Sequence, residues 1–120
     1  MLDVRKWAFG VFLALAFSSK ALAWGAIAVA GAANAEADGV TYGVSAGKST
    51  PDAAKFDAAG QCQKKGAGRC QVVVTFQGCG AFAVAPYRGG AGSGPDRSTA
   101  ERAAMQRCGS MCKLVTSTCE

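Results

Sequence analysis

The sequence predicts an α+β fold of two pseudo-repeats, each running strand, loop, helix, strand, with an antiparallel sheet, two short helices and disulfide staples. Three observations support this prediction. The segments 25–30 and 80–85 share the pattern Gly-Ala-(Ile/Phe)-Ala-Val-Ala, whose alternation is typical of strands. Each is followed by an Ala-rich helical segment, and these end at Cys62 and Cys108. The chain also has six cysteines: Cys62, Cys70, Cys79, Cys108, Cys112 and Cys119.

Residues 1–23 have the features of a secretory signal peptide. Two basic residues precede an apolar run at 7–17, and Ala-Leu-Ala at 21–23 forms a cleavage site. The alternative is a membrane anchor, but a spanning helix needs about 20 apolar residues. Lys20 interrupts the run before that length. We therefore expect one secreted or periplasmic domain at 24–120, with no membrane span after cleavage.

The charge of the chain favours solubility rather than a nucleic-acid partner. The formal net charge is +5. Cleavage would lower it to +3, because the leader carries Arg5, Lys6, Lys20 and Asp3. Nucleic-acid-binding domains usually combine a dense basic stripe with aromatic residues, and the aromatic residues of this chain are scattered.

The cysteines predict three disulfides in an oxidising compartment. A zinc site is the alternative, but the chain has no histidine and no Cys-x-x-Cys pair, so no metal or cofactor is expected. Six cysteines allow many connectivities. Symmetry and proximity favour Cys62–Cys70 and Cys108–Cys112, which leaves Cys79–Cys119 to join the two halves.

Helix starts and turns complete the expected order of elements. Thr50 followed by Pro51 marks the first helix start, and Ser98 with Glu101 forms a capping box for the second. Strands are expected at 24–30, 40–45, 71–77, 80–85 and 113–118. Gly78 to Gly80 is short enough for a tight hairpin, and four glycines and two prolines predict a loop at 86–97.

The two halves, 24–78 and 79–120, match in their core positions. Besides the shared strand pattern, Ala54, Ala58 and Cys62 correspond to Ala100, Ala104 and Cys108, and Cys70 with Val72-Val73 corresponds to Cys112 with Leu114-Val115. Repeated small and apolar residues indicate packing rather than chemistry.

This arrangement resembles the domain of unknown function 4189 family of small exported bacterial proteins, over 24–119. The resemblance rests on the Trp-Gly-Ala-Ile-Ala opening at 24–28, Tyr-Gly-Val-Ser at 42–45, the two helices ending in cysteine and the Cys-x-Val-Val strand at 70–73. It implies export and this fold, and no common activity. The second half departs from the pattern, because it has no evident match to Tyr42-Gly43.

The function that we expect is a secreted or periplasmic binding module for a protein or a cell-envelope surface. The alternative is a small envelope-acting enzyme, but no catalytic residue can be named because the histidine dyads that activate Ser or Cys are excluded. Two basic or aromatic sites are candidate partner contacts, because Tyr and Arg are enriched in binding hot spots. They are the loop pair Tyr87-Arg88 and the turn residues Lys64, Lys65 and Arg69.

Overall fold

The structure is a computed structural model that describes residues 23–31, 39–66 and 69–120. The predicted signal segment therefore lies outside the described residues, apart from Ala23. Within the described ranges the elements are β1 (Trp24–Ala30), β2 (Thr41–Lys48), α2 (Pro51–Lys64), β3 (Gln71–Phe76), β4 (Cys79–Ala85), β5 (Arg88–Gly94), α3 (Arg97–Cys108) and β6 (Lys113–Cys119). None of the helices in these ranges is long and apolar enough to cross a membrane.

The elements form two units with the same topology, which confirms the α+β class and the two pseudo-repeats. The strand order is β2-β1-β3 in the first sheet and β5-β4-β6 in the second, and all neighbouring strands are antiparallel. The strands are thus divided between two sheets. Each unit runs hairpin, helix, strand, with the repeated Gly-Ala-(Ile/Phe)-Ala-Val-Ala segment as its central strand.

Each helix packs closely on its own sheet through small residues. In α2 the buried face is Ala54, Ala58 and Cys62, and in α3 it is Ala100, Ala104 and Cys108. The strand beneath each helix contributes a glycine, Gly43 in β2 and Gly90 in β5. A Cβ added at either glycine would fall on the helix backbone. Small side chains on both surfaces therefore let the helix backbone approach the strand.

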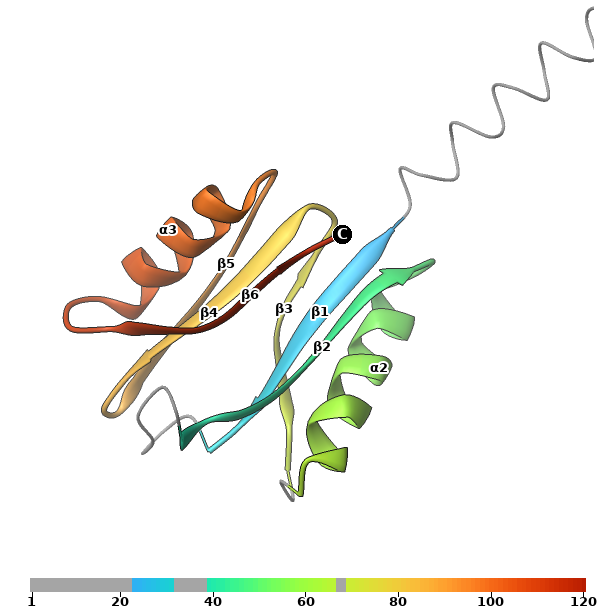
Figure 1. Ribbon diagram of the computed structural model, residues 1–120, viewed down its shortest axis with the longest axis horizontal. Coiled ribbons are helices and arrows are strands. Elements are labelled where there is room, and N and C mark those ends of the chain that lie inside the picture. Colours follow the sequence, from blue (N-terminus) through green and yellow to red (C-terminus); the bar gives the residue numbers. More distant parts are fainter. Residues whose placement is uncertain (1–22, 32–38, 67–68) are drawn as a thin grey trace, which may run out of the picture.

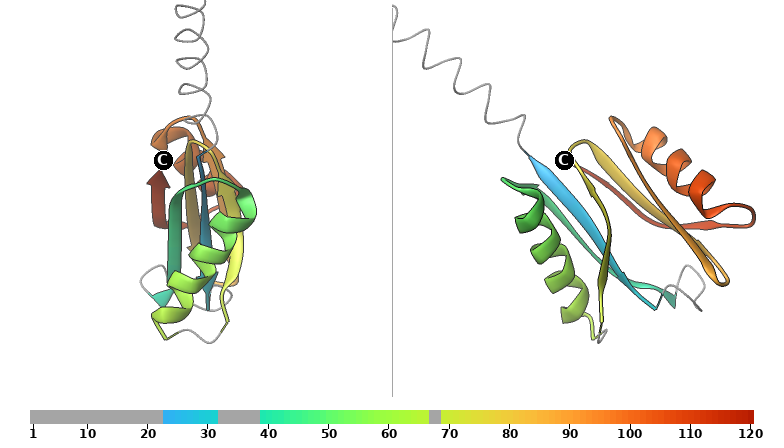
Figure 2. Two further views of the ribbon diagram at one scale, coloured as in Figure 1. Left: turned by 90° about the vertical axis from the view of Figure 1, so that its right-hand side faces the viewer. Right: turned by 180° about the vertical axis from the view of Figure 1, so that it is seen from behind.

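The large apolar side chains lie on the opposite faces of the sheets and pack against each other. This core contains Ile27, Val29, Val40, Phe76, Phe82 and Val84. The layers run α2, first sheet, second sheet, α3, with the helices on the outside (Figures 1 and 2). Burying these side chains supplies the main apolar contribution to stability, at roughly 1.5–3 kcal/mol for each large one.

All three predicted disulfides are present. Cys62–Cys70 and Cys108–Cys112 each join the end of a helix to the residue before the following strand, and Cys79–Cys119 joins the first residue of β4 to the last residue of β6. The last bridge spans 40 residues of sequence, whereas the Cys108–Cys112 bridge spans 4. The chain-entropy model gives the longer loop a stabilisation of about 4 kcal/mol and the shorter one about 2 kcal/mol.

The predicted tight hairpin at Gly78 to Gly80 is wrong, because β3 and β4 belong to different sheets. The chain crosses between the sheets at Gly78, whose carbonyl accepts a hydrogen bond from the backbone N–H of Glu120 at 2.9 Å. The pairing of the two strands decides this path. β3 pairs with β1 in the first sheet, and β4 is the central strand of the second.

The predicted loop at 86–97 is also wrong, because residues 88–94 form β5. Glycine is normally depleted in strands, which is why composition predicted a loop. Here the glycines are required by packing. Added Cβ atoms at Gly90 and Gly92 would collide with the backbone of α3 at Cys108 and Ala104. Only Pro86 and Tyr87 form the connecting turn, since Ala85 already pairs with Arg88.

The helix starts were predicted correctly in one unit and wrongly in the other. Thr50 caps α2, and its hydroxyl accepts a hydrogen bond from the backbone N–H of Ala53 at 3.1 Å. The predicted capping box of Ser98 and Glu101 does not form, because α3 begins earlier and Asp96 is its cap. An aspartate is as good an N-cap as serine, and it lies one residue before the first helical residue.

Replacing Gly90 by alanine should lower the free energy of unfolding by about 2 kcal/mol or more, because the added methyl group would collide with α3. Gly60→Ala within α2 is the matched control. Its added Cβ meets nothing within 4 Å, so the better helix propensity should raise stability by up to about 1 kcal/mol. Urea unfolding of the oxidised proteins measures both. A Gly90→Ala protein as stable as the wild type would contradict the close packing of α3.

Candidate functional site

A groove lies between the two sheets beside the turn that joins β4 and β5. Its volume is about 880 Å³, and it is open to solvent. Apolar residues of three strands line it, namely Val29 of β1, Val73 of β3 and Phe82 of β4. The lining is completed by Ala30, Gly31, Gln63, Arg69, Cys70, Gln71, Tyr87, Arg88 and Gly89. The groove therefore has an apolar base and a polar rim with two arginines.

The turn at one side of the groove holds an exposed tyrosine in an unfavourable backbone conformation. Tyr87 has a φ of 64°, in the left-handed region, and its side chain is 81% exposed. Pro86 fixes φ near −65°, so this turn cannot be one of the primed types that match the twist of a hairpin. A non-glycine residue in the left-handed region is uncommon, and such residues cluster at functional sites.

The neighbouring arginine is held in place by the second unit. The Nη2 atom of Arg88 donates a hydrogen bond to the backbone carbonyl of Ser110, which lies within the Cys108–Cys112 loop. A guanidinium has five N–H donors, so this contact orients the group without using it up. The disulfide loop and the β4–β5 turn together fix one charged side of the groove.

The sequence-predicted contact residues are only partly brought together. Tyr87, Arg88 and Arg69 all line the groove. Lys64 is exposed in the last turn of α2, and it does not line the groove. Lys65 packs on β2 instead, where its Nζ atom donates to the carbonyl of Tyr42 at 2.7 Å and lies 4.5 Å from the centre of the Tyr42 ring.

Several other basic side chains have structural partners at the sheet edges. Arg97 donates to the backbone carbonyl and hydroxyl oxygens of Ser117 on β6, at 2.8 and 2.7 Å, and Arg107 donates to the carbonyl of Ala91 on β5 at 2.9 Å. Among the described residues, the Arg69 side chain has no hydrogen bond or ion pair, so its charge is free to meet a partner.

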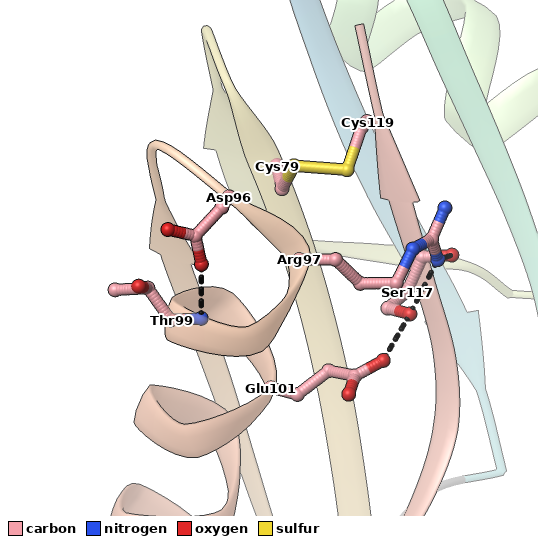
Figure 3. The surroundings of a disulfide bond; sticks show 7 residues. All are labelled: Cys79, Asp96, Arg97, Thr99, Glu101, Ser117 and Cys119. Atoms are coloured by element: carbon pink, nitrogen blue, oxygen red, sulfur yellow. Dashed lines mark hydrogen bonds between the residues drawn. A yellow bond between two sulfur atoms is a disulfide. The ribbon is translucent and has the colours of Figure 1, made fainter.

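A second polar cluster lies beside the Cys79–Cys119 bridge (Figure 3). The hydroxyl of Ser117 donates to the Glu101 carboxylate at 2.6 Å and accepts from Arg97. Glu101, which the sequence assigned to a capping box, therefore joins α3 to β6. A serine paired with a carboxylate resembles part of a catalytic dyad, but the arginine that donates to the hydroxyl oxygen opposes its use as a nucleophile.

The cap of α3 is a carboxylate whose pKa is lowered in the folded protein. Hydrogen bonds from the backbone N–H and the side chain of Thr99 hold the pKa of Asp96 below its usual value. The N–H bond is 2.7 Å long (Figure 3). Because the pKa is lowered in the folded state, the cap stabilises α3 above the ordinary aspartate pKa and loses this effect as the pH falls through the lowered value.

Sequence reasoning identified the rim of the groove and missed its base. Val29, Val73 and Phe82 were predicted only as strand residues, and Gly89 as part of a loop. The repeat contains the signal that could have located the groove. Gly43 and Gly90 occupy the same place beneath their helices, so the two copies can be aligned on them. Aligning these two glycines places Gly89 opposite Tyr42, a match that the sequence comparison did not find.

The fold and its cysteines define a class of small disulfide-bonded proteins with two sheets between two helices. The chain belongs to the family described as "Domain of unknown function (DUF4189)", whose model matches residues 24–119. Among solved structures it is similar to the NMR structure of Rv1813c from Mycobacterium tuberculosis, at 26% identity and a TM-score of 0.56. The match covers 82% of this chain and 76% of that protein. No curated protein matches the chain.

Replacing Tyr87 by glycine should give a more stable protein than replacing it by alanine, by about 1 kcal/mol. Both changes remove the ring, and only alanine keeps a Cβ in the left-handed region. Thermal or urea unfolding of the pair measures the difference. Equal stabilities would show that the backbone at position 87 is not strained. The left-handed φ would then give no reason to regard Tyr87 as a functional residue.

Proposed function

We propose that the protein is an exported binding module that recognises a protein or a cell-envelope surface through the β4–β5 turn and the groove beside it. The observation that carries this proposal is Tyr87, a large side chain that is exposed at a backbone position where tyrosine is disfavoured. Maintaining such a residue destabilises the fold locally, and contact with a partner explains why it is kept.

The surroundings of Tyr87 support binding rather than catalysis. Two arginines flank the groove, and its described lining contains no carboxylate and no free thiol. Glycoside hydrolysis and most acid–base chemistry require facing carboxylates or a base beside a nucleophile. Tyrosine and arginine are instead the residue types that most often dominate binding interfaces.

The three disulfides indicate an oxidising environment outside the cytoplasm. Together with the leader at 1–23, they support a secreted or periplasmic location. The protein recovered from the medium or the periplasm should accordingly begin at Trp24, as N-terminal sequencing would show. An intact Met1 on a cytoplasmic protein would contradict export.

Site-specific photo-crosslinking tests the recognition surface. A benzophenone amino acid at position 87 should give adducts with cell-envelope proteins or glycans, because this side chain projects from the turn. The matched control is the same group at position 56, since Phe56 on α2 is 84% exposed and lies away from the groove. Adducts of equal yield and identity from both positions, or from neither, would contradict the proposal.

A further inference from the structure

The duplication provides an internal comparison for the groove. β1 pairs Ala28 with Gly43, and β4 pairs the equivalent Ala83 with Gly90. In this register Gly89 of the second unit takes the place of Tyr42 in the first. Two residues earlier in each copy, Tyr87 takes the place of Val40.

The two copies differ in whether this place is filled. In the first unit Val40 is 7% exposed within the core between the sheets, and Tyr42 packs against the same core. Lys65 then covers the Tyr42 ring. In the second unit Gly89 has no side chain, and Tyr87 points into solvent. A Cβ built at Gly89 would lie 3.2 Å from the ring of Phe82, so the missing side chain adjoins the base of the groove.

We propose that the groove binds one aromatic side chain of an extended segment of a partner protein, with a neighbouring carboxylate of that segment paired to Arg69 and Arg88. This inference rests on the proposed binding function and names the chemistry of the partner. The aromatic ring would occupy the space that Tyr42 occupies in the first unit. It would contact Val29, Val73 and Phe82, which line the base of the groove.

The charge of the rim argues for an acidic partner. The described lining carries two arginines and no carboxylate to balance them. Arg88 is oriented by Ser110 and keeps free N–H donors, and Arg69 has no polar partner among the described residues. Guanidinium groups bind carboxylates with paired, charge-assisted hydrogen bonds, so an acidic residue next to the aromatic one satisfies both arginines.

The openness of the groove argues for a protein segment rather than a free small molecule. Small-molecule sites usually enclose most of the ligand surface, whereas this groove is open to solvent. A segment that extends past the groove would also contact the exposed Tyr87 ring at the rim. That additional contact would strengthen the binding of the partner's aromatic side chain in the groove.

A peptide titration followed by NMR tests the inference on the oxidised protein. The probe is a blocked peptide with Glu-Tyr-Glu at its centre, compared with Gln-Tyr-Gln and Glu-Ala-Glu peptides of the same length. We expect the first peptide to shift the amide signals of Gly89 and Val73, and each of the other two to bind at least about 5-fold more weakly. Free 3-(4-hydroxyphenyl)propionate carries the same ring and one carboxylate, and we expect it to bind more weakly than the peptide.

Variants of the protein locate the site. Gly89→Tyr should fill the groove as Tyr42 does in the first unit and weaken binding by about 10-fold or more, because the peptide ring loses its place. Arg69→Ala should weaken it by about 2- to 5-fold and reduce its dependence on salt. Arg102→Ala on α3 is the matched control, since Arg102 does not line the groove and interacts with Ser98 and Asp96 at the start of its own helix, so peptide binding should not change.

Several results would overturn the inference. They are unshifted groove signals, equal binding of the Gln-Tyr-Gln peptide, equal binding of the free propionate, and full binding by Gly89→Tyr. If Gly89→Tyr fails to fold, as loss of dispersed amide signals would show, Arg69→Ala and the peptide series decide the question. One combined result would separate the two proposals. If position 87 still gives crosslinks in a folded Gly89→Tyr protein, and the peptide shifts no groove signal of the wild-type protein, the binding function stands and the groove is rejected as its site.

Discussion

The close approach of each helix to its own sheet is the constraint on which the rest of the structure depends. Gly43 and Gly90 leave no room for a side chain beneath the helix backbone, and the facing helix positions are alanine or cysteine. The layer between each helix and its own sheet is therefore thin and built from small residues. Its buried side chains are alanine and cysteine, each of which contributes less to stability than a large apolar side chain.

The large apolar side chains must consequently be buried on the other face of each sheet, where the two units meet. Ile27 and Val29 of one unit pack with Phe82 and Val84 of the other, which are their counterparts in the repeat. This shared core makes each unit dependent on its copy. The Cys79–Cys119 bridge and the hydrogen bond from Glu120 to Gly78 hold the end of β6 at the crossing between the units.

The two copies differ in how completely their side chains fill the core between the sheets. The first unit keeps Val40 and Tyr42 in the core, and Lys65 fixes the Tyr42 ring from outside. The second unit has glycine in place of Tyr42 and an exposed tyrosine in place of Val40. The same scaffold thus has a closed side and an open side. The open side carries the oriented charge of Arg88 and the charge of Arg69, which has no polar partner among the described residues.

Local signals in the sequence were sufficient for the features that depend on neighbouring residues. The Thr50 cap, the helix faces and the three disulfides follow from spacing and symmetry, because each concerns residues near in sequence or related by the repeat. β5 could not be predicted from its glycines, since the reason for them is the backbone of α3 lying above. The groove was missed for a similar reason. It depends on which side chains meet across two sheets, and no short stretch of sequence records that.

Tyrosine nitration tests the central claim, that one copy is filled and the other open, most directly. The chain has two tyrosines, and they occupy the two sides being compared, Tyr42 on the closed side and Tyr87 beside the groove. Mass spectrometry after brief treatment of the folded protein with tetranitromethane would give the rate at each. The structure predicts rapid nitration of Tyr87 and slow nitration of Tyr42 until the protein unfolds. Equal rates in the folded protein, or faster nitration of Tyr42, would contradict it.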